Sequence, residues 1–270
     1  MPVTNTDNLT EFEEISLDRM HAVILLDRYD SKYCLDRTEL EDVLEEIKQD
    51  YYILEIEGSR IQQYKTIYYD TSGNHFYLEH HNGIANRHKL RKREYVGSDL
   101  VFLEIKHKNN KGKTSKDRLR LNDFQSNLSI DERNFMKQHT PLNGERIEPK
   151  FGSLFNRITL VNRNMKERCT IDTELQFESF GLPTKEMKNL VVIELKQEKN
   201  GQRSLLAEVL KARKIYPCSF SKYCIGRALN EPELKNNLFK EDILKINRHF
   251  GTADAQVVSE NTEFYHRKYS

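Results

Sequence analysis

The sequence predicts an α+β protein built on one large antiparallel sheet or eight-stranded barrel, with helices packed outside. Three observations support this prediction. About eight segments alternate apolar and polar residues with the period of a strand, and four or five others repeat apolar residues with the period of a helix. In the middle of the chain, short turns separate the strand-like segments, as in antiparallel hairpins. No linker rich in Pro, Gly or Ser interrupts the chain, so one domain is expected over residues 21–250.

The N-terminal part supplies a lead-in, one strand and one helix. Residues 1–20 are polar and acidic, and we expect a lead-in that ends in a short helix. Residues 23–35 alternate as a strand does. Apolar residues then recur at helical spacing over residues 36–52, with Asp36 or Thr38 as the expected N-cap.

Four strand-like segments follow in the middle of the chain. They cover residues 62–70, 84–96, 100–108 and 115–121. Gly97-Ser98 and the residues from Asn109 to Gly112 have the composition of tight turns. The last three of these strands are therefore expected to form consecutive hairpins.

The C-terminal half mixes strands and helices. Strands are predicted over residues 154–162, 167–177 and 190–196, after a connection over residues 141–152. Helices are predicted over residues 129–138, 204–214, 222–229 and 234–248. Residues 251–270 are polar and are expected to form a tail.

The chain is rich in charge but nearly neutral. It has 43 Lys and Arg against 42 Asp and Glu, and charged residues make up 31% of it, against roughly 25% in an average domain. No apolar run approaches the roughly 20 residues of a membrane-spanning helix, and the polar start is unlike a signal peptide. The four cysteines show no C-x-x-C spacing, which argues against a zinc site or disulfide framework. Reduced thiols in a cytoplasmic protein are expected.

The charges are sorted onto single faces of the predicted strands. Lys89, Arg91 and Arg93 share one face, because successive side chains of a strand alternate. A solvated outer face would explain any one such strand. If the strands close into a barrel, however, these faces would line a basic lumen suited to a ligand with several phosphates in a row. A lone glutamate among the cations would then be expected to hold a divalent metal.

Short motifs follow one another along the chain in an informative order. They are Arg28-Tyr29-Asp30-Ser31-Lys32-Tyr33, Tyr68-Tyr69-Asp70-Thr71, Lys89-Leu90-Arg91-Lys92-Arg93-Glu94-Tyr95, Phe102-Leu103-Glu104-Ile105-Lys106, Asn156-Arg157, Arg168-Cys169-Thr170-Ile171-Asp172-Thr173, Val192-Ile193-Glu194-Leu195-Lys196 and Phe220-Ser221-Lys222-Tyr223. In this order and spacing, over about residues 28–229, they resemble the vacuolar transporter chaperone (VTC) domain of the triphosphate tunnel metalloenzyme, or CYTH-like, superfamily. The resemblance is to its stand-alone bacterial type.

The resemblance implies an eight-stranded antiparallel tunnel with basic inner walls. It implies a polyphosphate polymerase that transfers the γ-phosphate of ATP to a growing polyphosphate chain with a divalent metal, Mn²⁺ or Mg²⁺. ATP and polyphosphate would be its partners, a membrane protein is a further candidate partner, and no nucleic acid is expected. By position in the motifs, the residues of the site would be Arg91, Arg93, Lys106, Arg157 and Arg168 in catalysis, Lys32, Lys89 and Lys222 in substrate binding, and Glu194 as the metal ligand.

Three positions depart from the superfamily pattern. The triphosphatase branch has Glu-x-Glu-x-Lys where this chain has one acid, Asp30, two residues before Lys32, which favours the VTC branch. Ser219 stands in place of a lysine, and Phe155 in place of a tyrosine. Two alternatives therefore stay open: a triphosphatase that uses the same tunnel, and a polyphosphate-binding subunit without catalysis.

Two further signals are weaker. Gly112-Lys113-Thr114 lacks the earlier glycine of a phosphate-binding P-loop. His75, His80 and His81 could form a metal cluster, but an exposed strand end or loop is the expected setting.

Overall fold

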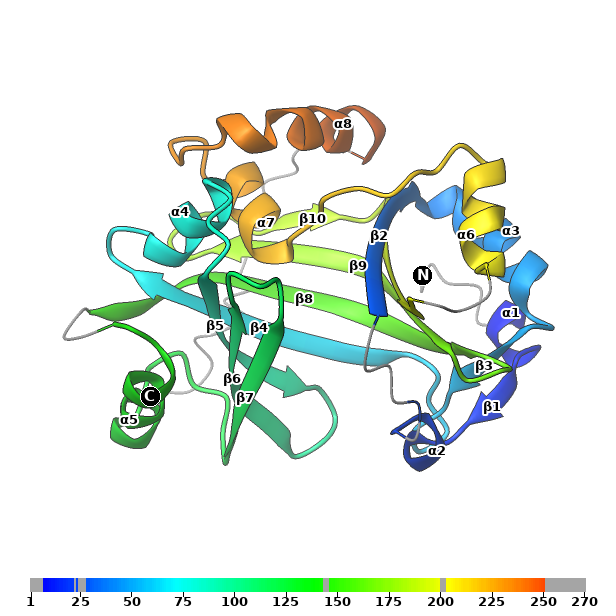
Figure 1. Ribbon diagram of the computed structural model, residues 1–270, viewed down its shortest axis with the longest axis horizontal. Helices are drawn as coiled ribbons and strands as arrows, with labels where there is room; N and C mark the ends of the chain where they lie inside the picture. The colour runs from blue at the N-terminus through cyan, green and yellow to red at the C-terminus, as the bar shows by residue number, and fades with distance from the viewer. Residues whose placement is uncertain (1–6, 22, 24–27, 143–145, 200–202, 251–270) are drawn as a thin grey trace.

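The computed structural model describes residues 7–21, 23, 28–142, 146–199 and 203–250, which form one large sheet flanked by helices (Figure 1). The main path of the sheet has eight strands, each antiparallel to its neighbours, and this confirms the predicted α+β class. In spatial order the strands are β2 (Arg28–Asp36), β11 (Leu190–Glu198), β9 (Glu167–Ser179), β8 (Ile147–Asn162), β4 (Gln62–Thr71), β5 (Arg87–Tyr95), β6 (Leu100–Lys108) and β7 (Thr114–Leu121).

Three short strands extend this path. They are β1 (Glu13–Ile15), β3 (Tyr51–Leu54) and β10 (Lys185–Met187). β1 pairs in parallel with β3, while β3 and β10 pair antiparallel with β8 and β9. The helices α1 (Asp7–Thr10) and α2 (Leu17–His21) flank β1 in the segment expected as a lead-in. Residues 24–27 of the first predicted strand and the whole predicted tail lie outside the described residues.

The sheet curls so that its two halves face each other. Lys106 on β6 and Glu194 on β11 are five strand spacings apart in the sheet order, which would be about 24 Å in a flat sheet. The charge of Glu194 nevertheless acts on Lys106, as do the charges of Lys32 and Lys196. Only a curled sheet brings these side chains within reach, and their faces must point inward.

The curl does not close into the predicted barrel. Within the described part of the chain, the end strands β2 and β7 pair with neighbours on one side only along the main path. The free edge of β2 is instead used by another segment, because the backbone N–H of Cys218 donates to the carbonyl of Lys32 at 2.8 Å. The fold is therefore a curled open sheet rather than a closed cylinder.

Apolar side chains cover the outer face of one half of the sheet. The helices α3 (Arg37–Ile47) and α6 (Leu205–Ala212) pack there against Ile171 and Ile193, which alternate with the charged residues of β9 and β11. Asp36 is the N-cap of α3 and accepts the N–H of Thr38 at 3.0 Å. No helix in the described ranges has the length and apolar character that crossing a membrane requires.

The helix α5 (Ile130–His139) covers the outer face of the other half. Met136 joins Leu90, Leu103 and Ile105 of β5 and β6 in one buried cluster. Lys92 lies on the same face and is buried, but its Nζ contacts a carboxylate oxygen of Glu132 at 2.8 Å. It also donates to the carbonyls of residues 125 and 127, at 2.8 Å each. The buried ammonium is thus fully paired, and it ties α5 to the sheet.

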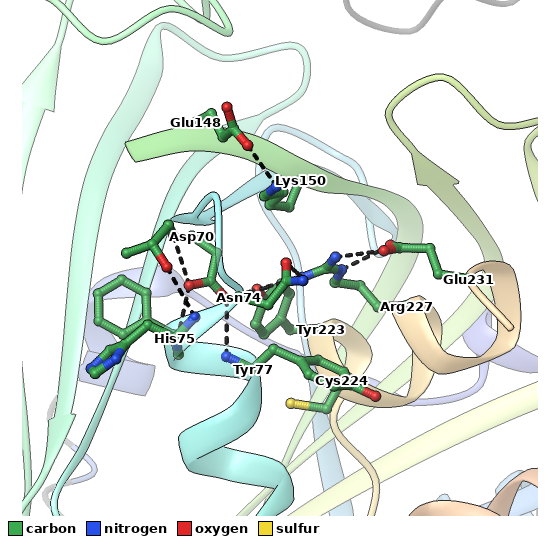
Figure 2. A network of polar contacts seen from close by, with 12 residues as sticks. Asp70, Asn74, His75, Tyr77, Glu148, Lys150, Tyr223, Cys224, Arg227 and Glu231 are labelled. Atoms are coloured by element: carbon green, nitrogen blue, oxygen red, sulfur yellow. Dashed lines mark hydrogen bonds and ion pairs between the residues drawn. The ribbon is translucent and has the colours of Figure 1, made fainter. Parts of the chain in front are cut away.

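The helices α4 (His75–His81) and α7 (Lys222–Asn230) are joined through a buried carboxylate (Figure 2). Asp70, at the end of β4, accepts the backbone N–H groups of Phe76 and Tyr77 at 2.9 Å each, and also the hydroxyl of Tyr223. Arg227 on α7 donates to Asn74 at 3.0 Å. This network fixes the start of α4 against α7, and η1 (Asn237–Phe239) and α8 (Lys240–Phe250) follow α7 in the chain.

Several element boundaries differ from the sequence predictions. The helix predicted to begin at residue 234 begins at Lys240 as α8, after the short turn η1. The helix predicted to reach residue 52 ends at Ile47, and residues 51–54 form β3, in which Tyr51 and Ile53 are buried beside β8. The connection predicted over residues 141–152 is also partly wrong, because β8 begins at Ile147. Pro149 is a residue that usually interrupts a strand. Here it lies at a register shift of the β4–β8 pairing, where a strand tolerates proline.

The three histidines lie on α4, so a strand end or loop is the wrong setting for them. His81 is buried, and its Nε2 accepts the backbone N–H of Leu238 at 3.2 Å. Burial, with the charges of Lys89 and Arg87, lowers the pKa of His80 to about 2. Over the described residues, no group of three or more His, Cys, Asp or Glu side chains could hold a metal ion by itself.

Candidate functional site

The inner face of the sheet carries rows of charge that cross β5, β6 and β7. Register places Lys89, Lys106 and Lys116 side by side on the three strands. The neighbouring row is Arg91, Glu104 and Arg118. Because residues two apart share a face, both rows point to the same side of the sheet. Five cations therefore surround one carboxylate on this wall.

Glu104 is the centre of that wall. Its side chain is 1% exposed, and its carboxylate contacts the guanidinium of Arg91 at 2.7 Å and that of Arg118 at 3.0 Å. Lys116 forms a third ion pair with it. Burial alone would raise the pKa of Glu104, but Arg91 and Arg93 more than offset this and hold it well below the usual range. Glu104 thus orients the cations and is not free for a metal.

A second carboxylate, Asp172, organises the wall of β8 and β9. The guanidinium of Arg157 donates to its two oxygens at 2.6 and 2.8 Å, and Lys222 from the start of α7 pairs with it as well. Burial would raise the pKa of Asp172, but Arg157 and Lys222 lower it to about 2. The carboxylate stays ionised and holds both cations in place.

Aromatic rings support the same cations. The Nζ of Lys222 lies 4.3 Å from the ring centre of Phe155, and the guanidinium of Arg157 lies 5.2 Å from it. Tyr64 stacks on Phe155 with ring centres 5.4 Å apart, and the guanidinium of Arg93 lies 5.2 Å from the ring centre of Tyr64. Phe155, one of the departures from the family pattern, is therefore a buried platform for two cations.

The segment that leads into α7 holds two further lysines. The Nζ of Lys32 donates to the carbonyl of Phe220 at 2.6 Å, and the Nζ of Lys89 donates to the hydroxyl of Ser221 at 3.0 Å. Burial lowers the pKa of Lys89 to about 7, with contributions from Lys32 and Lys106. The lysines of β2 and β5 thus meet at the N-terminus of α7.

Several cations of the inner face have no carboxylate of their own. In the described part of the structure, Arg93, Lys106 and Arg168 form no ion pair, although Arg93 makes a long hydrogen bond of 3.4 Å to Thr66. Burial lowers the pKa of all three and neighbouring cations lower it as well, while the charges of Glu104 and Glu194 offset this only in part. The inner face therefore holds positive charge that the protein itself does not neutralise.

Glu194 lies on this face, on the strand next to Arg168 and across the curl of the sheet from Lys106. Its carboxylate pairs with Lys196 at 2.6 Å, and register places it between Lys32 and Thr170. Burial would raise the pKa of Glu194, but Lys196 and Lys32 keep it well below the usual range. The hydroxyl oxygen of Thr170 is buried and has no hydrogen-bond partner among the residues that the structure describes. A carboxylate beside an unused hydroxyl fits a hard divalent cation whose other ligands come from phosphates and water.

The structure brings the nine residues selected from the sequence near enough for their charges to act on one another. They lie on β2, β5, β6, β8, β9, β11 and the start of α7: Lys32, Lys89, Arg91, Arg93, Lys106, Arg157, Arg168, Glu194 and Lys222. Asp172, Glu104 and Lys116 were not selected. Their roles depend on which residues face them on neighbouring strands. The only sequence signal for them is that each lies on the charged face of its strand.

Comparison with known proteins identifies one family. The family model described as the VTC domain matches residues 27–230. No curated protein matches the chain.

Among solved structures, the PH1819 protein of Pyrococcus horikoshii is 13% identical, covers 72% of this chain and 96% of its own, and has a TM-score of 0.37. The Hippeastrum protein HpAC1 is described as a candidate adenylyl cyclase with a dominant triphosphatase activity. It is 15% identical, the match covers 79% of this chain and 99% of HpAC1, and the TM-score is 0.46. The Pct1 RNA triphosphatase of S. pombe is 9% identical, the match covers 93% of this chain and 96% of Pct1, and the TM-score is 0.28. Likenesses at this level do not extend an activity from those proteins to this chain.

Proposed function

The chain belongs to the VTC domain family, and on that premise we propose that it is a polyphosphate polymerase. It would transfer the γ-phosphate of ATP to the end of a growing polyphosphate chain that lies along the basic inner face. The observation that carries this proposal is the uncompensated positive charge of Arg93, Lys106 and Arg168, beside cations held in fixed geometry by Glu104 and Asp172. Such a surface favours a linear polyanion over a singly charged ligand.

Phosphoryl transfer needs positioning and charge neutralisation more than it needs a protein nucleophile. The attacking group would be a terminal phosphate oxygen of the acceptor, which is already anionic, and ADP would leave. Arg91, Arg93 and Arg157 would bind the oxygens of the transferred group and stabilise charge that spreads over them in the transition state. Lys32, Lys89 and Lys222 would hold the chain where β2, β5 and α7 meet.

A divalent metal would be held by Glu194 with the hydroxyl of Thr170 beside it. Bound there, the ion would neutralise phosphate charge and orient the oxygens of the substrate. Lys196 would release the Glu194 carboxylate to the ion and remain available for a phosphate oxygen. Glu104 is a poorer ligand, because three cations already occupy it.

The test is to incubate the purified chain with ATP and Mn²⁺ and analyse the products. Long-chain polyphosphate with release of ADP is the expected result. Free phosphate alone would replace the polymerase by the triphosphatase alternative, and binding without turnover would replace it by a binding subunit. The variant Arg157→Gln should lose the activity. The control Arg163→Gln, which changes an exposed arginine paired with Glu13, should keep it.

A further inference from the structure

Two cysteines that are 184 residues apart in the sequence meet at the edge of the inner face. The Sγ of Cys34 on β2 and the Sγ of Cys218, before α7, lie 3.3 Å apart, and both are free thiols. Both side chains are partly exposed, whereas Cys169 and Cys224 are fully buried. Cys34 and Lys32 are two residues apart on β2 and so share the inner face.

The backbone holds the two thiols in register. The N–H of Cys218 donates to the carbonyl of Lys32 at 2.8 Å, so the two segments run at about the spacing of neighbouring strands. The Nζ of Lys32 donates to the carbonyl of Phe220 at 2.6 Å. This second contact holds the segment before α7 to β2 on the C-terminal side of Cys218. A disulfide has its sulfurs about 2.05 Å apart, so the thiols would approach by only about 1.3 Å.

The pair has the chemistry of an attacking and a resolving thiol. The hydrogen bond between the two thiols lowers the pKa of Cys218, and the charge of Lys32 lowers it as well. The same hydrogen bond and burial raise the pKa of Cys34. Of the two thiols, Cys218 therefore ionises more readily, and the thiolate is the nucleophile in thiol oxidation.

We propose that Cys34 and Cys218 form a redox-modification site that a hydroperoxide, such as hydrogen peroxide, converts into a disulfide. The thiolate of Cys218 attacks one peroxide oxygen, the O–O bond breaks, and a sulfenic acid forms with release of hydroxide. The hydroxide takes up the proton that Cys218 lost on ionisation and becomes the first water. The thiol of Cys34 then displaces the sulfenic oxygen as a second water. Two thiols are oxidised by two electrons, one peroxide is reduced, and both thiol protons leave in water.

The disulfide would join the edge strand β2 to the segment that carries the N-terminus of α7. That segment presents Ser221 to Lys89 and Lys222 to Asp172. Oxidation would therefore fix the segment before α7 against β2 at one end of the inner face, and reduction would let the two separate again. Formation of the disulfide does not depend on polyphosphate chemistry. A negative result for the disulfide therefore leaves the polymerase proposal standing, and a negative polymerase assay leaves the disulfide proposal standing.

The experiment treats the full reduced chain with excess hydrogen peroxide and then analyses it without reductant. We expect a monomer about 2 Da lighter, a peptide map that joins Cys34 to Cys218, and two of the four thiols left after denaturation. The Tm should rise by roughly 5–10 °C, because the bridge closes a long loop, and a dithiol should reverse the change.

The variants Cys34→Ser and Cys218→Ser should each lose the mass change and the rise in Tm. The matched control Cys169→Ser, at a buried cysteine, should keep both. A mass gain of about 32 Da from sulfinic acid, a covalent dimer, or a bridge mapped to Cys169 or Cys224 would overturn the proposal.

Discussion

Asp172 and Arg157 face each other across β8 and β9 and form a two-point ion pair, with N···O distances of 2.6 and 2.8 Å. Lys222 reaches the same carboxylate from α7. The side chain of Asp172 is 3% exposed, so three elements of the fold meet at one buried anion. In the proposed reaction Asp172 touches no phosphate and acts by positioning two cations that do.

Asp172→Asn should lower the free energy of unfolding by about 3 kcal/mol, because it leaves two cations without their buried partner. Turnover should fall about tenfold or more, since Arg157 and Lys222 lose their orientation. The KM for ATP should change less than kcat, because removal of an anion does not weaken attraction of phosphate. Urea unfolding and steady-state kinetics measure these effects.

Asp30→Asn is the matched control for stability. Asp30 pairs with Arg28 at 2.9 Å, but both side chains are about 40% exposed. An exposed pair contributes less than about 1 kcal/mol. Equal loss of stability in the two variants would contradict the central role given to Asp172.

Most of the sheet was predictable because its charged and apolar residues alternate. The strand predicted over residues 100–108 has the boundaries of β6, and Asp36 caps α3 as expected. The helix α4 was missed because its first N–H groups are satisfied from outside the helix, by Asp70 at the end of β4. A local sequence pattern contains no such distant cap.

The site was predictable in its residues but not in its pairings. The alternation of charged and apolar residues predicts that Arg91 and Glu194 lie on charged faces. It does not show that, among the described residues, Glu104 pairs with three cations and Glu194 with one. That difference comes from register and curl, which set distances between residues far apart in sequence. The meeting of Cys34 with Cys218 has the same origin.

Glu194→Gln should strongly lower metal-dependent turnover, with a much smaller effect on the free energy of unfolding. The side chain is 25% exposed and, among the described residues, its carboxylate has one ion pair, so the fold depends on it less than on Asp172. Turnover should fall about 100-fold, and raising the Mn²⁺ concentration should not restore it. Glu186→Gln, at an exposed pair with Lys188, is the control and should behave as the parent chain does. Full activity of Glu194→Gln would refute the assignment of Glu194.

Binding of a polyanion should weaken as pH rises from 6.5 to 8.5. Burial lowers the pKa of Lys89 and Lys116 to about 7 and that of Lys222 to about 8, so these lysines are charged at the lower pH and largely neutral at the higher one. An anion binds the protonated forms better, and affinity should fall about tenfold. Trimetaphosphate is a suitable probe for calorimetry, because its own charge is constant over this range.

Lys89→Arg tests the origin of that pH dependence. Arginine stays protonated throughout the range, so this variant should show a smaller loss of affinity than the parent chain. An unchanged slope would mean that Lys89 does not contribute.

Glu132→Gln should destabilise the chain without affecting ligand binding. The substitution leaves the buried Lys92 without its carboxylate, which should cost about 3 kcal/mol, while glutamine can still complete the capping box at Ser129. Lys92 lies on the outer face, so affinity for trimetaphosphate should be unchanged. The control Asp131→Asn, at an exposed position in the same helical turn, should be neutral in both assays. A loss of affinity in Glu132→Gln would contradict the division of charge between the two faces.

Gly226→Ala should destabilise the chain even though alanine favours a helix over glycine by about 1 kcal/mol. A Cβ at position 226 of α7 would overlap the ring of Phe151, which is fully buried and packed against Phe177 and Tyr68. Because the ring cannot move aside, we expect a net loss of about 2 kcal/mol in urea unfolding. Phe151→Leu should relieve the overlap, so the double variant should be more stable than the sum of the single effects predicts. If Gly226→Ala were as stable as the parent chain, α7 would not be held against β8 at this contact, and the placement of Lys222 would lose its support.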